Sequence, residues 1–406
     1  MKKDNKNTLL TLTTAALSLP GMVPQAVLGQ NAISTEKVFS YRYSSYSEDP
    51  IPGSAALGGE DADRYDIDVH QLRFKSPITG NTEITVDVLS ESMSGASPRY
   101  VLPIENEEGQ ITPIQVMSSA TIAEERNAID VAFTSYANTS ISTTGISYST
   151  ENDYSSFGLR TQYAWFFNEK NTSFELGASA SQDFIDATQE RNPLPNTPLR
   201  VTDQEKTSTS LTVGLSQILS KSSLISSSFN LATFSGYTSD PYKEIYISNI
   251  DEVVPDSRPD RRNQWAWSNQ YRQHFDKLNG SLHFDYRYFG SNWETRSHTI
   301  DIRWLHNFGN DWVVTPSIRY YDQGAAVFFR NWYDFERADG YHSSDYRLSD
   351  YSAISSRIKI SKRFASGAIH LSFEDYSSDA GSSDPQFASP SLVSFSQLTL
   401  GFDFGF

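Results

Sequence analysis

Charged residues recur at alternate positions in two parts of the chain, mostly acidic in the first third and basic in the last third. Successive side chains of a β-strand point to opposite faces, so alternate positions bring such charges to one face. If these faces line a closed barrel, they oppose each other across water and create a transverse field that selects ions. The first set of candidate pore-lining residues is Asp66, Asp68, His70, Asp87 and Asp130. The second set is Arg287, Arg303, Arg319, Arg357, Lys359 and Arg363.

An alternative of equal weight is that inward charges of both signs pair with each other. Asp285 and Asp301 interrupt the basic set. Inward charges of both signs are ordinary in a water-filled barrel. The sequence therefore leaves two interpretations open, an ion-selective field or local charge pairing inside a lumen narrowed by loops.

Histidine and cysteine usage gives little support to catalysis or metal binding. The seven histidines are scattered, and none has the sequence spacing of a metal site or of a Ser-His-Asp triad. Cysteine is absent, which excludes disulfides, thiolate metal ligands and a lipid-modified cysteine. We therefore expect no enzyme activity, no metal and no cofactor.

The elements that would position these charges are segments of alternating hydrophobicity bounded by turn residues. They predict an all-β fold, a transmembrane antiparallel up-and-down β-barrel of about 16 strands, in the range of about 14 to 18. The segments are 37–46, 64–75, 82–91, 122–136, 140–150, 154–167, 171–184, 206–219, 223–237, 263–275, 279–290, 293–307, 311–321, 349–363, 367–376 and 391–406.

The connections between these segments alternate in length. Links after even-numbered segments are short, whereas most links after odd-numbered segments are long and acidic, which is the asymmetry of an outer-membrane barrel. An even number of strands then leaves both termini in the periplasm. The long links are 47–63, 92–121, 185–205, 238–262, 322–348 and 377–390.

The last strand ends on alternating aromatic residues, Phe402, Phe404 and Phe406. This ending resembles the closing strand and assembly signal of outer-membrane barrels, which implies the barrel assembly machinery as a partner. An edge strand of a soluble β-sandwich is the alternative. Aromatic residues also collect near the ends of other segments, where rings suit the lipid headgroup level.

The N-terminus has the pattern of a secretory signal, with three lysines by position 6 and a short apolar run over 9–19. We expect cleavage near Gly29 and Gln30, with Ala26 as the alternative position, which leaves 30–406 as a single barrel domain. The formal net charge of −16 argues against nucleic-acid binding. Arg258, Arg261 and Arg262 precede two tryptophans and are candidates for contact with lipopolysaccharide phosphates at the outer-membrane surface.

Several stretches resemble a widespread family of proteobacterial exported proteins, a domain of unknown function regarded as an outer-membrane β-barrel. The resemblance implies an outer-membrane location and supplies no activity, cofactor or functional residue. The matching stretches are 91–98 (ESMSGASP), 115–120 (QVMSSA) with 124–126 (EER), 148–154 (YSTENDY), 234–237 (FSGY) and 286–289 (YRYF).

These features together predict a porin-like channel or passive transporter in the outer membrane of a Gram-negative bacterium. The alternative is a non-conducting barrel that acts as a scaffold or export partner for other envelope proteins. Occupancy of the lumen discriminates between them, because a segment 93–118 folded into the pore would block conduction. Neither the solute nor the oligomeric state follows from the sequence.

Overall fold

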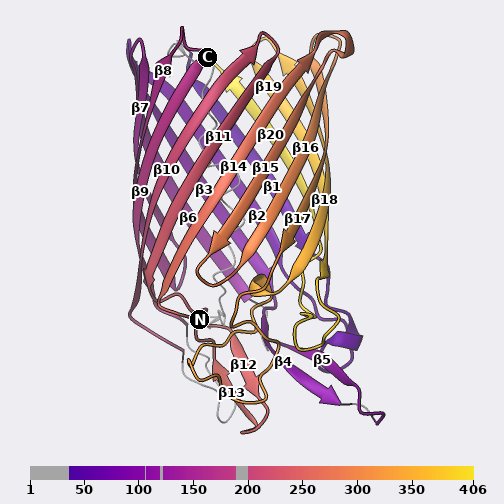
Figure 1. Cartoon of the computed structure of the whole chain (residues 1–406). Helices are drawn as coiled ribbons and strands as arrows, with labels where there is room; N and C mark the ends of the chain where they lie inside the picture. Colours follow the sequence, from indigo (N-terminus) through magenta and orange to yellow (C-terminus); the bar gives the residue numbers. More distant parts are fainter. Residues whose placement is uncertain (1–35, 106, 119–121, 189–199) are drawn as a thin grey trace, which may run out of the picture.

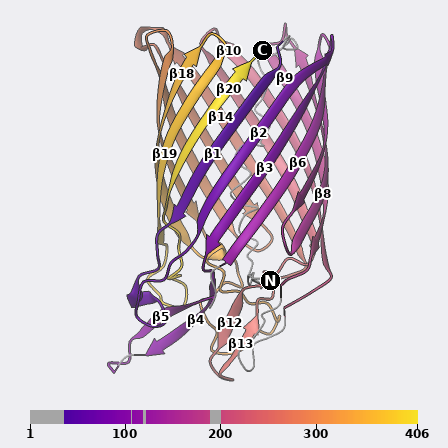
Figure 2. The same cartoon turned by 180° about the vertical axis from the view of Figure 1, so that it is seen from behind.

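The computed structural model describes residues 36–105, 107–118, 122–188 and 200–406. Among these residues, sixteen strands form one closed antiparallel barrel in which each strand pairs with the next along the chain, and β1 pairs with β20 (Figures 1 and 2). The predicted fold class is therefore confirmed. The predicted signal peptide, 1–29, lies outside the described residues.

The barrel strands follow the predicted segments closely. In order round the sheet they are β1 (Val38–Glu48), β2 (Asp66–Thr79), β3 (Thr82–Gly95), β6 (Ile122–Tyr136), β7 (Ser140–Thr150), β8 (Tyr154–Phe167), β9 (Thr172–Ile185), β10 (Gln204–Ser220), β11 (Ser223–Gly236), β14 (Arg261–Phe275), β15 (Gly280–Ser291), β16 (Arg296–Phe308), β17 (Trp312–Gln323), β18 (Tyr351–Phe364), β19 (Gly367–Ala380) and β20 (Phe395–Gly405). All the long loops lie at one end of the barrel together with two short links, 151–153 and 292–295, and every connection at the other end is short (Figure 1). We name these the turn end and the loop end.

Two small hairpins in the long loops were not predicted. They are β4 (Pro98–Glu105) with β5 (Ile111–Met117), and β12 (Glu244–Ile247) with β13 (Glu252–Pro255). Both hairpins lie beyond the loop end, so β4 and β5 do not enter the lumen (Figure 1). Single helical turns occur at η1 (Gly53–Ala55), η2 (Asp276–Leu278) and η3 (Tyr346–Leu348). Within the described ranges, no helix is long and apolar enough to cross a membrane.

The outer face of the barrel carries the large apolar side chains. On β8, for example, Phe157 and Leu159 are 53% and 52% exposed. Arg160, the residue after Leu159, points inward to Asp130. Contiguous apolar surface of this extent suits lipid, not water. The predicted outward positions on β8, β14, β15, β16 and β20 are confirmed by the register.

Tryptophans mark both ends of this apolar face on β14 to β16. The Trp265 ring covers Gly290 near the loop end, where a Cβ would lie 2.7 Å from the ring. The Trp304 ring covers Gly280 near the turn end in the same way, at 2.5 Å from such a Cβ. Glycine is therefore needed at both positions so that the rings can lie flat on the sheet, and the rings sit where headgroups would be.

The main apolar core lies beneath the loops at the loop end. Six long loops pack together there, and we call them the cap: 49–65, 237–260, 324–350, 381–394 and the described residues of 96–121 and 186–203. Tyr65 is 2% exposed and packs with Met93, and Phe329 is fully buried in a second cluster. Burying such side chains contributes about 1.5–3 kcal/mol each. The cap is therefore a folded unit and not a set of loose loops.

Candidate functional site

The inner face of the barrel is defined by the positions that alternate with the apolar outer ones. On β20, Leu398 and Phe402 face outward and are exposed, whereas Asp403 faces inward and forms an ion pair with Arg42 of β1 at 2.8 Å. The continuous register transfers this assignment from strand to strand round the closed sheet. Each predicted pore-lining residue can therefore be placed on one face.

The structure contradicts the inward placement of Asp66, Asp68 and His70. The Tyr43 hydroxyl donates to Asp68 Oδ1 at 2.6 Å, and the His70 ring lies 5.1 Å from the Tyr43 ring. Tyr43 shares the outer face of β1 with Tyr41, whose ring packs against Phe402 at 5.5 Å. All three predicted residues have the parity of this outer face, at positions toward the loop end of β2.

The error arises because apolar side chains change faces along β2. Leu72 and Phe74 are exposed on the outer face, whereas Ile67 and Val69 point inward and pack beneath the cap. No bulge intervenes, since the register with β1 is continuous over this stretch. Parity read from Ile67 therefore gives the wrong face for its acidic neighbours.

Asp87 and Asp130 do face inward, as predicted, but each is neutralised by a neighbouring arginine. Arg73 Nε lies 2.6 Å from Asp87 Oδ1, and the Arg160 guanidinium forms a bidentate pair with Asp130. Sequence reasoning missed both arginines, although the parity of Leu72 and Phe74 predicts that Arg73 faces inward. The two predicted acids that face inward are therefore paired and do not form an uncompensated acidic wall.

The predicted basic residues all lie on the inner face, on β15 to β18. Arg303 is the one with strong ion pairs, to Asp285 and to Asp301 at 2.8 Å. Arg357 approaches Glu374 only to 3.6 Å. Ion pairs thus neutralise some of these inward basic residues and leave the others without a carboxylate beside them.

Several inward cations have no ion-pair partner among the described residues. Arg287, Arg319 and Lys359 make no ion pair within the part of the chain that the structure describes. Arg287 and Arg319 are also exposed, although they point into the barrel. A guanidinium that is inward and exposed indicates a lumen with room for water at this depth.

A Ser-His-Asp arrangement, which the histidine spacing did not predict, also lies on the inner face near the turn end. His370 Nδ1 lies 2.8 Å from Ser361 Oγ, and His370 Nε2 lies 2.7 Å from Asp403 Oδ2. Acyl transfer would also need free N–H donors for the oxyanion. The N–H groups of β18 to β20 are used in strand pairing, and Arg42 holds the Asp403 carboxylate. This arrangement therefore resembles a triad in contacts without offering its oxyanion site.

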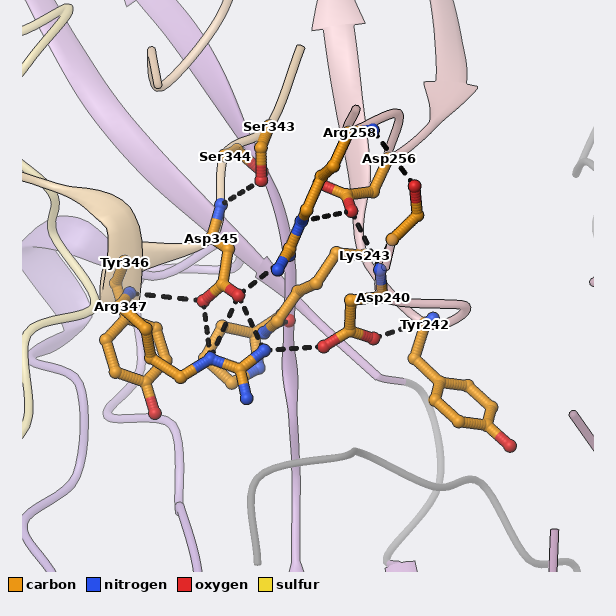
Figure 3. A network of polar contacts seen from close by, with 12 residues as sticks. Asp240, Tyr242, Lys243, Asp256, Arg258, Ser343, Ser344, Asp345, Tyr346 and Arg347 are labelled. Atoms are coloured by element: carbon orange, nitrogen blue, oxygen red, sulfur yellow. Dashed lines mark hydrogen bonds and ion pairs between the residues drawn. The ribbon is translucent and has the colours of Figure 1, made fainter. Parts of the chain in front are cut away.

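The cap contains a network of buried charges that joins two loops (Figure 3). Asp345 lies between Arg347, at 2.6 Å, and Arg258, at 2.9 Å, and Arg347 also contacts Asp240 at 2.5 Å. Burial alone would raise the pKa of Asp345, but Arg347 and Arg258 outweigh it and hold that pKa well below its ordinary value. Burial lowers the pKa of the nearby Lys243 to about 8.

Three carboxylates gather beside the turn between β7 and β8, and their oxygens lie within 4.8 Å of one another. They belong to Glu124, Glu151 and Asp153. Glu124 accepts hydrogen bonds from Asn152, and the Tyr242 hydroxyl donates to Asp153. Burial raises the pKa of Asp153 to about 6. Glu151 lies 3.6 Å from Arg126 Nε, so all three acids have partners in the protein, and protonation of Asp153 reduces the repulsion among them.

The three arginines considered for lipopolysaccharide differ in their surroundings. Arg258 is buried in the cap, and Arg262 faces inward with its guanidinium 4.4 Å from the centre of the Trp293 ring. Those two assignments are wrong, because both side chains are held within the protein. Arg261 is exposed on the outer face, so it is the one of the three still open to contact with lipid phosphates.

Comparison with known protein families assigns the chain to one of them. A family model with the description "Protein of unknown function (DUF3570)" matches residues 9–388. The chain belongs to this family. The matched part of this DUF3570 protein includes β1 to β19 and most of the cap, so the resemblance seen in the sequence is confirmed. No curated protein matches the chain.

Solved outer-membrane proteins share the general architecture at low similarity. The BenF-like porin from Pseudomonas fluorescens Pf-5 is 9% identical, with 91% of this chain and 98% of that chain covered and a TM-score of 0.45. The TodX deltaS2S3 mutant monoaromatic hydrocarbon channel is 11% identical, with 92% and 91% covered and a TM-score of 0.44. The outer membrane protein opdK from Pseudomonas aeruginosa is 9% identical, with 91% and 98% covered and a TM-score of 0.41. At such values the likeness carries nothing about what the DUF3570 protein does.

The location follows from the DUF3570 chain's own architecture. A closed barrel satisfies every ladder hydrogen bond within the sheet, and its apolar exterior suits hydrocarbon. These two properties support a place in an outer membrane.

Proposed function

We propose that the protein is an outer-membrane channel through which small solutes pass passively along the barrel lumen. The observation that carries this proposal is the exposure of Arg287 and Arg319 on the inner face. Charged groups at a dry interface would need partners, so their exposure supports a hydrated path. The position of β4 and β5 outside the lumen adds support.

The proposed orientation puts the cap outside the cell and the turn end, with the C-terminus, in the periplasm. All the long loops lie at one end of the barrel and every connection at the other end is short, which supports this arrangement.

Planar-bilayer recording on the purified, refolded protein tests the proposal. We expect discrete conductance steps, absent from a heat-denatured sample of the same preparation. Folded protein that inserts into vesicles but gives no steps would remove the channel function.

The scaffold alternative is favoured by one observation, the ordered cap. Arg99 of β4 pairs with Glu244 of β12 at 2.9 Å, and buried charges join further loops. A folded outer surface is what a protein partner would require. If the wild type gives no steps and loosening the cap through Asp345→Asn does not restore them, the scaffold becomes the better account.

A further inference from the structure

Arg287 and Arg319 lie close together on the inner face, just beneath the cap. Arg287 of β15 is opposite Thr299 of β16, and Thr299 is opposite Tyr321 of β17. Arg319 is two residues before Tyr321, so it lies on the same face of β17. The two arginines therefore face the lumen from strands separated only by β16, and Tyr321 is level with Arg287 in the register. Two like charges thus face the same region of the lumen, and they repel each other.

No carboxylate of the described chain neutralises this pair. Asp301 is directly opposite Arg319 in the register, but it pairs with Arg303 at 2.8 Å. Asp285 binds both Arg272 and Arg303. The nearest acids are therefore occupied, and the repulsion between Arg287 and Arg319 is left for water or a mobile anion to relieve.

Aromatic side chains line the wall next to the pair. The Tyr321 and Tyr351 rings lie 5.4 Å apart, and the Tyr376 and Phe395 rings stack at 4.7 Å with an angle of 15°. The Tyr321 hydroxyl donates to Gln323 at 2.6 Å, which fixes the ring in place. The pair of cations thus borders a rigid surface of aromatic rings and hydroxyl groups.

We propose that Arg287, Arg319 and Tyr321 form a binding site for small organic carboxylates that travel through the channel. This inference rests on the proposed function and adds the class of solute. A guanidinium presents parallel N–H donors that match the two oxygens of a carboxylate. An anion bound between the two arginines removes their mutual repulsion, and the adjacent rings accept the organic part of the solute. Arg357 and Lys359 continue the positive path toward the turn end.

The site must bind weakly if it serves passage, because tight binding would block the pore. We therefore expect a Kd for benzoate on the order of 1 mM. Saturation-transfer NMR on the full-length protein in detergent measures such affinities without any need for conduction. The neutral analogue benzamide, which lacks the carboxylate, serves as the matched ligand.

The double variant Arg287→Gln, Arg319→Gln should weaken benzoate binding at least tenfold and leave the weaker benzamide binding unchanged. Arg261→Gln on the outer face is the control variant and should bind benzoate as the wild type does. Heat-modifiable gel mobility shows whether each variant is folded. A folded double variant with wild-type affinity, or a wild type that binds benzamide as well as benzoate, would overturn the site.

Inorganic phosphate separates carboxylates from phosphorylated solutes. Because inorganic phosphate has no organic part for the rings to hold, we expect it to displace benzoate only at concentrations several-fold above the Kd for benzoate. Displacement at concentrations below that Kd would overturn the assignment to organic carboxylates. Conductance steps together with unaltered benzoate binding in the variant would sink this inference alone, whereas an absence of steps in the wild type would sink the proposed function.

Discussion

At the scale of single residues, charge pairing in this barrel is local. Asp87 and Asp130 each have an arginine on an adjacent or nearby strand, so these two acids do not form the uncompensated wall expected from the sequence. Parity correctly predicts the basic residues because apolar neighbours on β15 to β18 keep one face throughout. Parity fails on β2, because the apolar side chains of Ile67 and Val69 pack beneath the cap and do not face lipid.

The corrected placement leads to a prediction on ion selectivity. Arg319→Gln removes an uncompensated inward charge, so the chloride-to-potassium permeability ratio should fall by a factor of about two. The double variant Asp66→Asn, Asp68→Asn alters the outer face and should leave the ratio unchanged. Reversal potentials in a salt gradient measure both. A shift in the aspartate variant as large as that in Arg319→Gln would contradict the assigned faces.

The cap offers a second prediction at this scale. Asp345→Asn leaves Arg258 and Arg347 buried without their shared carboxylate, which should destabilise the cap by about 3–5 kcal/mol. Hydrogen exchange should accelerate in 237–260 and 324–350 while the barrel strands are unaffected. Asp339→Asn is the matched control, since its pair with Arg337 is exposed. Equal exchange in the two variants would show that the buried network does not hold the cap together.

At the scale of elements, the sixteen barrel strands were predictable because lipid imposes alternation on each of them. Three predicted segments, 122–136, 140–150 and 154–167, agree with β6, β7 and β8 at both ends. The hairpins β4 with β5 and β12 with β13 were missed because they pack on other loops, which imposes no period of two. Ile245 and Ile247 of β12 are buried by Tyr333 of another loop, a contact that no local pattern encodes.

The arrangement of connections predicts which segments are reachable from outside the cell. An epitope inserted between Asp339 and Gly340, in an exposed part of the cap, should be labelled on intact cells. An epitope between Asp276 and Lys277, at the turn end, should be labelled only after the outer membrane is opened. The reverse pattern would invert the proposed orientation.

At the scale of the whole molecule, the barrel is completed by a single seam between β1 and β20. Phe404 is opposite Phe39 on one side and Gly367 on the other, so the last residues take part in both pairings of β20. The predicted assembly role of Phe402, Phe404 and Phe406 is still a prediction. The position of these residues on the exposed outer face is what a recognition signal requires.

Removal of the last three residues tests the seam. Deletion of 404–406 should lower the fraction of folded protein in the outer membrane several-fold, because it opens backbone donors and acceptors to lipid. Heat-modifiable mobility measures folding. Phe335→Ser, which alters a 70% exposed ring in the cap, is the control. Wild-type yields of the truncated protein would show that the seam tolerates a shortened β20.

The seam between β1 and β20 also determines the order in which the barrel strands pair during folding. Every other pair of barrel strands is adjacent along the chain, whereas the contact between Arg42 and Asp403 joins residues 361 positions apart. Closing so long a loop costs about 3 kcal/mol more in chain entropy than closing a hairpin of about fifteen residues. Contacts of such separation come late in folding, so we expect hairpins to form first and the ring to close in the slowest step. Until that step, two unpaired strand edges stay open, and this interval is when the chain is most exposed to aggregation.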